Sequence, residues 1–349
     1  MEYTPSFRDR LYADSLNTTT ELRHHGIKGQ KWGVRRFQNK DGSLTDIGRK
    51  RYSQLSWSDK YNVKVAAKDQ GIKIKRDMKI SYHDISKDPN FDPKSGLLLQ
   101  THKLSYEDDA KAVNPRTNHL SLLHNSSGYY VNCTHCTAAY DLRRRGYDIA
   151  ASSAPGGGEE ANVIHKMYPN AESKTAKPVI SSKNYIDMFA DKVDNKKLQK
   201  LYVESYNHAT SINPIRAKEY QKACKKQGEA ILKQCESFGP NARGNVCMRI
   251  TCSGGHSLAF QNDSKGRTTF VDAQTMASLP KWSKGGKNSQ YYNDIICSAD
   301  PYFSAEILRY DNATPDINYM LKNHIINNPK LVTATDKSGN SKDFKVYQY

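Results

Sequence analysis

Cys133, His256 and Asp272 are the residues of this 349-residue chain whose types and spacing suit nucleophilic acyl transfer. Cys133 follows Asn132 at the start of a predicted helix, where unpaired N–H groups and the helix dipole favour a thiolate. The same N–H groups can hold the oxyanion that forms when a thiolate attacks a carbonyl carbon. Such a nucleophile also needs an imidazole, and the imidazole needs an orienting carboxylate. The sequence therefore predicts a Cys-His-Asp arrangement.

The positions of His256 and Asp272 fit the two ends of a hairpin. Alternating apolar residues predict strands over 245–252, 256–261 and 268–272, with a turn at 262–266. If the second and third strands pair antiparallel, both side chains emerge near the same end of the sheet. One imidazole nitrogen can then bond Asp272 while the other faces Cys133.

Four further residues complete the expected site. Gln274 is predicted to point the same way as Asp272, where it would donate to the oxyanion or fix the histidine. Asn132 is the alternative side-chain donor to the oxyanion. Gly254 and Gly255 are expected to leave room for a substrate backbone to approach.

Two helices should support these residues. One runs from about Asn132 to Gly146, and its terminal Arg143, Arg144 and Arg145 are expected to be solvated charges that suit the helix dipole. The other spans 215–238, with Cys224 and Cys235 on its apolar side, and ends at Gly239-Pro240. Helices followed by a strand meander predict the α+β class.

The amino-acid composition limits the class of protein and the partners it can have. Lys and Arg number 53 and Asp and Glu 36, so the formal charge is +17, while 37% of residues are apolar. Such an excess of positive charge favours nucleic acid, acidic protein surfaces or anionic lipid as partners. No apolar run reaches the roughly 18 residues that a spanning helix needs, so we expect no membrane partner. The first residues lack the apolar region of a secretory signal, so most of the seven cysteines are expected to be thiols.

The chain divides into four predicted parts. Residues 1–55 form a small basic module, whose stretch 23–51 carries nine basic residues and two acids, a net charge of +7. Residues 56–114 are expected to be a linker with short helices, and 115–318 the catalytic domain. Residues 319–349 follow as a tail without a strong pattern, expected to be partly disordered. Within the catalytic domain, Pro155 and the glycines after it predict a flexible loop.

Several motifs in order resemble those of the papain-fold toxin family of glutamine deamidases. They are Asn132-Cys133-x-x-Cys136, the arginine-rich helix end with Gly146, Ala242-Arg243-Gly244, Gly255-His256, Phe270-Val271-Asp272-Ala273-Gln274 and Arg309-Tyr310-Asp311-Asn312. The resemblance covers about residues 115–318. It implies a papain-like cysteine hydrolase fold, in which a catalytic helix packs on an antiparallel sheet, and a triad carried by Cys133, His256 and Asp272. The polar insertion 173–212 does not align with that family.

The N-terminal module resembles a segment carried by phage and prophage structural proteins. The resemblance lies in His24 to Arg36, Asp41 to Thr45 and Gly48 to Tyr52. It implies a virion-associated or prophage-encoded product, located in a phage virion or in the bacterial host cytoplasm. Trp32 and Phe37 among the basic residues fit either stacking on nucleic acid bases or a docking peptide with two hydrophobic anchors.

Other interpretations of the same residues stay open. Cys133 and Cys136, with Cys247 and Cys252, are alternatively a zinc site, and the first two a redox pair or inert core thiols. His256 is alternatively a satisfied strand histidine, and Asp272 a turn residue. Cys136, one turn into the helix, is expected to be buried packing. His24 and His25 are expected to be solvated, because no partner cysteine or acid lies nearby.

The favoured function is a cysteine-dependent amidohydrolase that deamidates glutamine side chains of a bacterial host protein, with no metal and no organic cofactor. A papain-like cysteine protease is the nearest alternative, because both reactions pass through the same thioacyl intermediate. A different class is a non-enzymatic virion structural protein that binds DNA or portal through residues 23–51.

Overall fold

A computed structural model describes residues 57–75, 77–115, 128, 131–154, 162–180, 214–250 and 254–347. The chain divides into two compact units, Met1–Lys60 and Tyr61–Tyr349. The predicted basic module, with Trp32, Phe37 and the His24-His25 pair, lies outside the described residues. So do the loop that begins at Pro155, residue Cys252 and the 181–212 part of the polar insertion.

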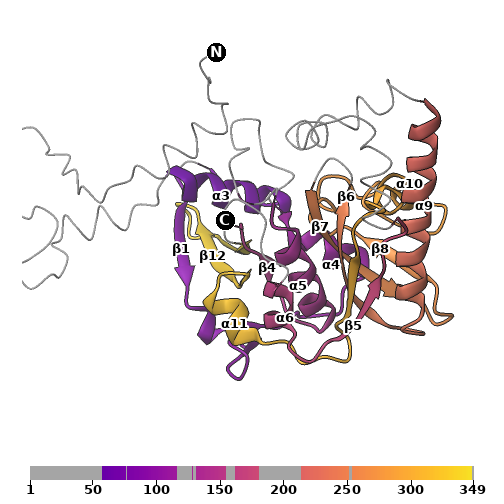
Figure 1. The fold of residues 1–349 in the computed structure, drawn as a ribbon. Helices are drawn as coiled ribbons and strands as arrows, with labels where there is room; N and C mark the ends of the chain where they lie inside the picture. Colours follow the sequence, from indigo (N-terminus) through magenta and orange to yellow (C-terminus); the bar gives the residue numbers. More distant parts are fainter. Residues whose placement is uncertain are drawn as a thin grey trace, which may run out of the picture. The chain divides into compact units, whose positions relative to one another are not determined.

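A six-stranded antiparallel sheet is the centre of the larger unit (Figure 1). Its strand order is β5-β10-β6-β7-β8-β9, and the four neighbouring strands β6 to β9 are consecutive in the chain. Gly244 permits the close contact between β6 and β10, because a Cβ there would lie 1.8 Å from the Leu308 carbonyl oxygen. The strands are β5 (Glu172–Ala176), β10 (Ala305–Arg309), β6 (Arg243–Ile250), β7 (Gly254–Asn262), β8 (Thr268–Val271) and β9 (Lys284–Gly286).

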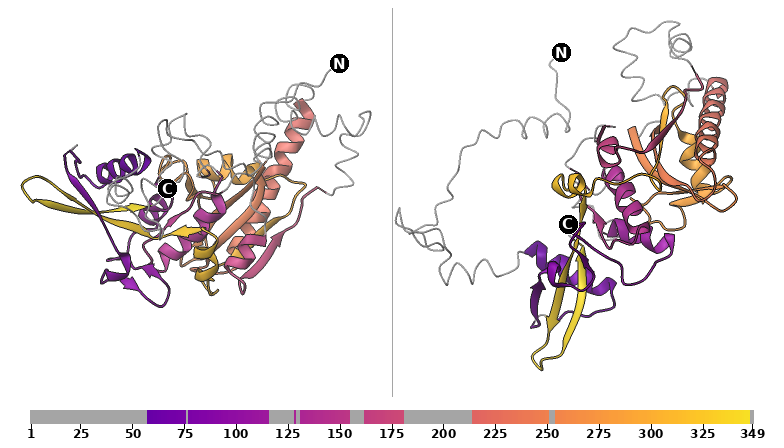
Figure 2. Two further views of the ribbon diagram at one scale, coloured as in Figure 1. Left: turned by 90° about the vertical axis from the view of Figure 1, so that its left-hand side faces the viewer. Right: turned by 90° about the horizontal axis from the view of Figure 1, so that it is seen from below.

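Helices α5 (Cys133–Arg144) and α9 (Pro214–Glu236) cover opposite faces of this sheet (Figure 2). Side-chain alternation in the strands explains why both faces are apolar. On β7, for example, Ala259 packs in the core with α5, whereas Leu258 and Phe260 pack in the core with α9. The two cores hold the sheet between the helices, so the position of α5 relative to β7 is fixed by packing.

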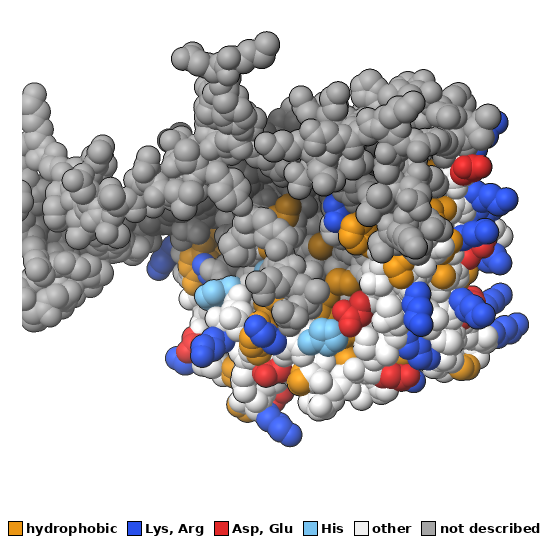
Figure 3. Space-filling view, viewed as in Figure 1, with side chains coloured by type: hydrophobic (Ala, Val, Ile, Leu, Met, Phe, Trp, Pro, Cys, Tyr) orange, Lys and Arg blue, Asp and Glu red, His pale blue; other side chains and the backbone are white. Residues whose placement is uncertain are grey.

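Helix α9 is amphipathic, as the sequence predicts. Its buried side includes Cys224 and Cys235, and the helix ends before Gly239, whose φ is +86°. Its outward side is basic, and Figure 3 shows Lys and Arg side chains gathered over this helix. The exposed lysines of α9 are Lys218, Lys222, Lys225, Lys226 and Lys233.

A second, three-stranded sheet has the order β1-β12-β13, formed by β1 (Lys79–His83), β12 (Pro329–Thr335) and β13 (Ser341–Tyr347). Its tight turn at 336–340 is stabilised by Asp336, whose Oδ1 accepts from the Ser338 and Asn340 amides, each at 2.9 Å. The expectation of a partly disordered tail over 319–349 is therefore wrong. The expected linker over 56–114 also belongs to the compact unit, because β1 pairs with β12. The partner of β1 is about 250 residues away, so local patterns could not reveal β1. The β12–β13 hairpin is local, with a turn at 336–340, and its alternation was overlooked.

Shorter elements connect these layers. The first part of the polar insertion 173–212 belongs to the six-stranded sheet, because β5 is an edge strand that pairs with β10. The remaining elements are α3 (Trp57–Asp69), η1 (Ile85–Lys87), β2 (Phe91–Asp92), β3 (Leu97–Leu98), α4 (Tyr106–Val113), β4 (Ala150–Ala151), α6 (Asn162–Met167), α10 (Gln290–Asp294), η5 (Ile296–Ser298), α11 (Ile317–Lys322) and β11 (Ile326–Asn327).

The α+β class with antiparallel sheets is confirmed. The predicted helix from Asn132 ends as expected before Gly146, whose φ is +100°. The predicted strands correspond to β6, β7 and β8, displaced by no more than two residues at either end. In the described part of the chain, no helix combines the length and apolar character that crossing a membrane requires.

Candidate active site

Cys133 lies at the first position of α5. The first backbone hydrogen bond of the helix runs from the Cys136 amide to the Asn132 carbonyl oxygen, at 3.0 Å. The amides of residues 133–135 consequently have no partner within the helix. They and the positive end of the helix dipole favour negative charge at the Cys133 sulfur, and the residue as a whole is only partly buried.

His256 and Asp272 meet as the hairpin predicts. His256 Nε2 lies 3.0 Å from Asp272 Oδ2. The register explains the contact, because Phe260 pairs with Phe270 and Asp272 therefore falls diagonally beside His256 on the same face. Both side chains are largely buried, at 15% and 5% exposure, so little water competes for this bond.

The same imidazole neighbours Cys133, and each of the two groups shifts the pKa of the other. Because Nε2 faces Asp272, Nδ1 is the ring nitrogen left for Cys133. Burial raises the pKa of Cys133, but His256, through its hydrogen bond and its charge, and the Ser257 amide lower it below its ordinary value. Burial lowers the pKa of His256, and the Asp272 carboxylate and Cys133 raise it to about 10. The lowered pKa of Cys133 and the raised pKa of His256 together favour a thiolate–imidazolium pair.

Three other described cysteines have thiol pKa values that are shifted the opposite way. Burial raises the pKa of Cys235 and Cys297, and it raises that of Cys247 to about 11. These thiols stay protonated near neutral pH, which distinguishes Cys133 from them as a nucleophile. Cys136 and Cys224 are buried, as the sequence predicts.

Asn132 is a structural hub, not a donor that faces a substrate. Its side chain is fully buried, its Nδ2 donates to the Ser152 carbonyl oxygen at 2.8 Å, and it makes no N-cap bond. Its Oδ1 accepts from Gln274, Asn114 and Cys136, at 3.2, 3.3 and 3.4 Å. These bonds and the complete burial of Asn132 favour Gln274 over Asn132 as the side-chain donor to an oxyanion. Its orienting role is consistent with these bonds.

Gln274 joins the two halves of the site. Its Nε2 donates one bond to Asn132 Oδ1, and its backbone amide donates to Asp272 Oδ1 at 3.1 Å. The first bond ties the loop after β8 to the start of α5, and the second holds the carboxylate that faces His256. One hydrogen of the Nε2 group is not used by these bonds, so Gln274 keeps a donor for an oxyanion.

The site reaches the surface beside Val131 and Gly255. Val131 is 47% exposed although it is apolar, and it lies two residues before Cys133. A Cβ added at Gly255 would meet no atom within 4 Å, so there is space for a ligand there, and glycine is not sterically required. Gly254, the other predicted approach residue, begins β7.

Sequence reasoning missed Tyr291 and Trp282. The Tyr291 hydroxyl donates to Asp272 Oδ2 at 3.3 Å, and the Trp282 ring packs edge-on against the Tyr291 ring at 5.8 Å. Tyr291 lies on α10, nineteen residues after Asp272. Ser289, whose side chain caps α10, was the local signal for this helix, but nothing in the sequence indicated its contact with Asp272.

The arginines at the other end of α5 are not solvated, contrary to expectation. Arg143 is 3% exposed and pairs with Asp109 and Asp148, at 3.3 and 2.9 Å. Arg144 pairs with Asp109 at 2.7 Å, and Arg145 pairs with Asp141 at 2.6 Å. These acids come from α4, from α5 itself and from the segment after it, so local sequence could not reveal the whole network.

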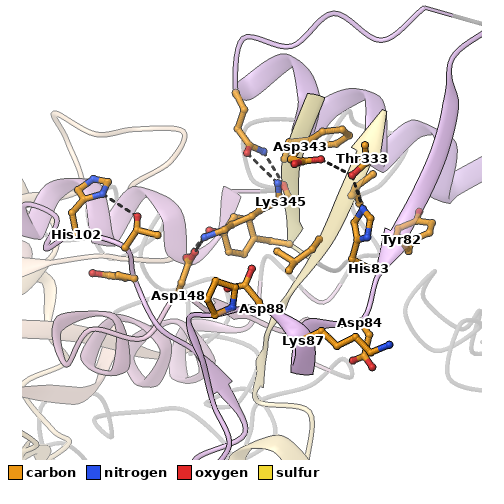
Figure 4. Close-up of a pocket in the computed structure, with 18 of the residues that line it drawn as sticks. Tyr82, His83, Asp84, Lys87, Asp88, His102, Asp148, Thr333, Asp343 and Lys345 are labelled. Carbon is orange, nitrogen blue, oxygen red and sulfur yellow. Dashed lines mark hydrogen bonds and ion pairs between the residues drawn. The ribbon is translucent and has the colours of Figure 1, made fainter. Parts of the chain in front are cut away.

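A separate pocket of about 900 Å³ lies away from Cys133, between the second sheet and the loop around His102 (Figure 4). At its floor, Asp148 accepts from Lys345 Nζ and the Tyr347 hydroxyl, at 2.5 and 2.6 Å. Along one wall, Thr333 bonds both His83 and Asp343. Acidic and basic side chains are mixed there, and none of the predicted site residues lines it.

The zinc interpretation depends on Cys252, which is outside the described residues. Across the described ranges, no group of three or more His, Cys, Asp or Glu side chains is arranged to hold a metal ion. Cys136, which such a site would use, is 1% exposed, and its thiol lies against Asn132 Oδ1.

The structure thus brings Cys133, His256, Asp272 and Gln274 together at the junction of α5 with the sheet. A nucleophile, a proton carrier and an orienting carboxylate in this order can perform acyl transfer. In comparisons with known proteins, no family model, no curated protein and no solved structure matches this chain.

Proposed function

We propose that this chain is a cysteine-dependent amidohydrolase in which Cys133 is the nucleophile, His256 the general base and acid, and Asp272 the orienting carboxylate. The observation that carries the proposal is the His256 imidazole, which lies 3.0 Å from the Asp272 carboxylate and is near enough to Cys133 for each group to shift the pKa of the other. The lowered pKa of Cys133 is a second support, because catalytic thiols need a thiolate at neutral pH.

The proposed reaction begins when the Cys133 thiolate attacks the carbon of a carboxamide. The Cys133 amide and a Gln274 Nε2 hydrogen stabilise the oxyanion. His256 protonates the nitrogen, the C–N bond breaks, and ammonia leaves a thioester on Cys133. Water then gives a proton to His256 and attacks the thioester, and the C–S bond breaks to restore the Cys133 thiolate beside protonated His256. The carboxylic acid that is released loses its proton to the free ammonia, which yields a carboxylate and ammonium. No metal or organic cofactor enters these steps.

The proposed substrate is a glutamine side chain of a bacterial host protein, and the product is glutamate. This choice and the papain-like architecture rest on the sequence resemblance of residues 115–318. A helix that begins at the nucleophile and packs on the antiparallel sheet carrying His256 is compatible with that architecture. We also propose that the chain is phage- or prophage-encoded, since residues 23–51 resemble phage structural proteins.

The test is mass spectrometry of a bacterial proteome incubated with the wild-type protein, with Cys133→Ala and with Cys297→Ala. Cys297→Ala is the matched control, because it removes another partly buried thiol whose pKa is raised. Glutamine-to-glutamate conversion with the wild type and the control, but not with Cys133→Ala, supports deamidation. New peptide termini with the same dependence indicate proteolysis instead. No Cys133-dependent change contradicts the enzymatic proposal and favours the structural virion class.

A further inference from the structure

Three donors hold the Asp272 carboxylate in place. His256 Nε2 and the Tyr291 hydroxyl both bond Oδ2, at 3.0 and 3.3 Å. The Gln274 amide bonds Oδ1, at 3.1 Å. Two donors on the same oxygen share its negative charge, so the strength of one bond depends on the presence of the other.

Tyr291 is rigidly placed for this contact. Its side chain is fully buried in the core beneath α9, and Trp282 packs against its ring. Helix α10 is fixed at its start, where the Ser289 hydroxyl accepts from the Tyr292 amide at 3.0 Å. Burial and the neighbouring Asp272 charge raise the pKa of Tyr291 well above its ordinary value, so its hydroxyl stays a donor.

We propose that Tyr291 is a positioning residue of the site that acts through Asp272. Its hydroxyl holds Oδ2 toward His256 and withdraws part of the carboxylate charge from the imidazolium. The pKa of His256 is then high enough for the imidazolium to stabilise the Cys133 thiolate, but low enough for it to release its proton to the departing nitrogen. This inference rests on the function proposed above.

The charged groups around His256 determine whether its pKa rises or falls when the Tyr291 hydroxyl is removed. The titratable groups that act on His256 are Asp272 and Cys133, and the same two act on Tyr291. The cation of β9, Lys284, is occupied by an ion pair with Glu107 of α4. Without the Tyr291 hydroxyl, the full carboxylate charge falls on the imidazolium, so the pKa of His256 rises further.

The experiment measures the alkylation rate of Cys133 against pH, without any substrate. A thiolate–imidazolium pair gives two inflections: the lower one reports thiolate formation, and the upper one reports loss of the His256 proton. In Tyr291→Phe we expect the upper inflection to move up by about half a pH unit, with little change in the lower one. Turnover should fall roughly threefold, the change that half a pKa unit makes in a protonation equilibrium.

Tyr292→Phe is the matched control. It removes a hydroxyl from the next residue of the same helix, which is also buried, but whose hydroxyl neighbours Cys297 and not Asp272. Its profile should overlay the wild type. If Tyr291→Phe does not fold, 3-fluorotyrosine at position 291 replaces it. This stronger donor should move the upper inflection down.

The outcomes separate this inference from the proposed function. A wild-type Cys133 that alkylates with one inflection at an ordinary thiol pKa removes the ion pair, and the proposed function fails with it. Two inflections in the wild type, with an unmoved or lowered upper inflection in Tyr291→Phe, overturn the role of Tyr291 alone. An equal shift in Tyr292→Phe also overturns it, because the effect would then come from packing.

Discussion

The two ends of helix α5 carry charge in different ways. At the C-terminal end, permanently charged Arg143 and Arg144 are buried against Asp109 and Asp148. At the N-terminal end, Cys133 and His256 become charged only when a proton passes from sulfur to imidazole. Both arrangements suit the helix dipole, with cations at one end and an anion at the other.

This difference in how charge is carried indicates that the C-terminal end of α5 is structural and that the N-terminal end can react. Arg143 is nearly inaccessible, and its charge is satisfied by two carboxylates and the Ile149 carbonyl oxygen. Cys133 is partly accessible, and the amides beside it have no partner within the helix. A compensated buried network holds the helix in place, while a pair that can lose its charges by one proton transfer is suited to catalysis.

The largest effect is expected at the N-terminal end. Cys133→Ser should lower amide hydrolysis by about 10⁴-fold or more, because the hydroxyl has no comparable tendency to ionise. The free energy of unfolding should change little, because serine is close to cysteine in size and His256 keeps its bond to Asp272. Turnover assays and urea unfolding measure the two quantities. Loss of activity together with a strongly reduced unfolding midpoint would make this end structural as well.

The C-terminal end should respond in the opposite way. Arg143→Met leaves Asp109 and Asp148 buried without one cationic partner, and should cost about 3–5 kcal/mol in the free energy of unfolding. The fraction that remains folded should keep its turnover number and the pH dependence of Cys133. Chemical unfolding and active-site titration check this. A folded variant with an altered pH profile would show that the two ends are coupled.

Asp272→Asn sharpens the comparison within the active end. Without the carboxylate, the pKa of His256, raised to about 10 in the wild type, should fall toward its ordinary value. The imidazolium is then lost at lower pH, so the alkaline limit of activity moves down, and turnover falls by about 10²-fold. The pH–rate profile is the measurement. An unmoved alkaline limit would mean that Asp272 does not act on His256.

An exposed ion pair provides the smallest expected effect. Lys111 pairs with Asp108 on α4 at 3.7 Å, and both side chains are about half exposed, at 43% and 57%. Lys111→Met should change the free energy of unfolding by less than about 1 kcal/mol, because solvent already screens the pair. The same unfolding measurement as for Arg143→Met applies. A comparable loss in both variants would remove the distinction between buried and exposed charge.

Local patterns predicted the parts of the fold that depend on neighbouring residues. Strands β6, β7 and β8 are consecutive in the chain, and a short turn joins β7 to β8, so their alternation sufficed to place His256 beside Asp272. Helix α5 was equally local, since Asn132 and Gly146 mark its ends. Strand β1 of the second sheet was missed because it pairs with β12 about 250 residues later, whereas the local β12–β13 hairpin was overlooked. Pairing over such separations leaves no mark in a single sequence.

The site residues that lie on these local elements were also predictable from the sequence. Residue types and hairpin geometry indicated Cys133, His256, Asp272 and Gln274. The burial of Asn132 was not predictable, because a polar side chain at a helix start fits an exposed donor as well as a buried one. Tyr291 and the partners of Arg143 depend on tertiary packing between separate segments.

The most direct test of the account is the ultraviolet thiolate absorbance of the wild type, with the Cys133→Ala spectrum subtracted, measured against pH. The account predicts a Cys133 thiolate midpoint below the ordinary value of about 8.5, and a return toward that value in His256→Ala. A midpoint at or above the ordinary value in the wild type, or one that His256→Ala leaves unmoved, would contradict the ion pair and the mechanism built on it.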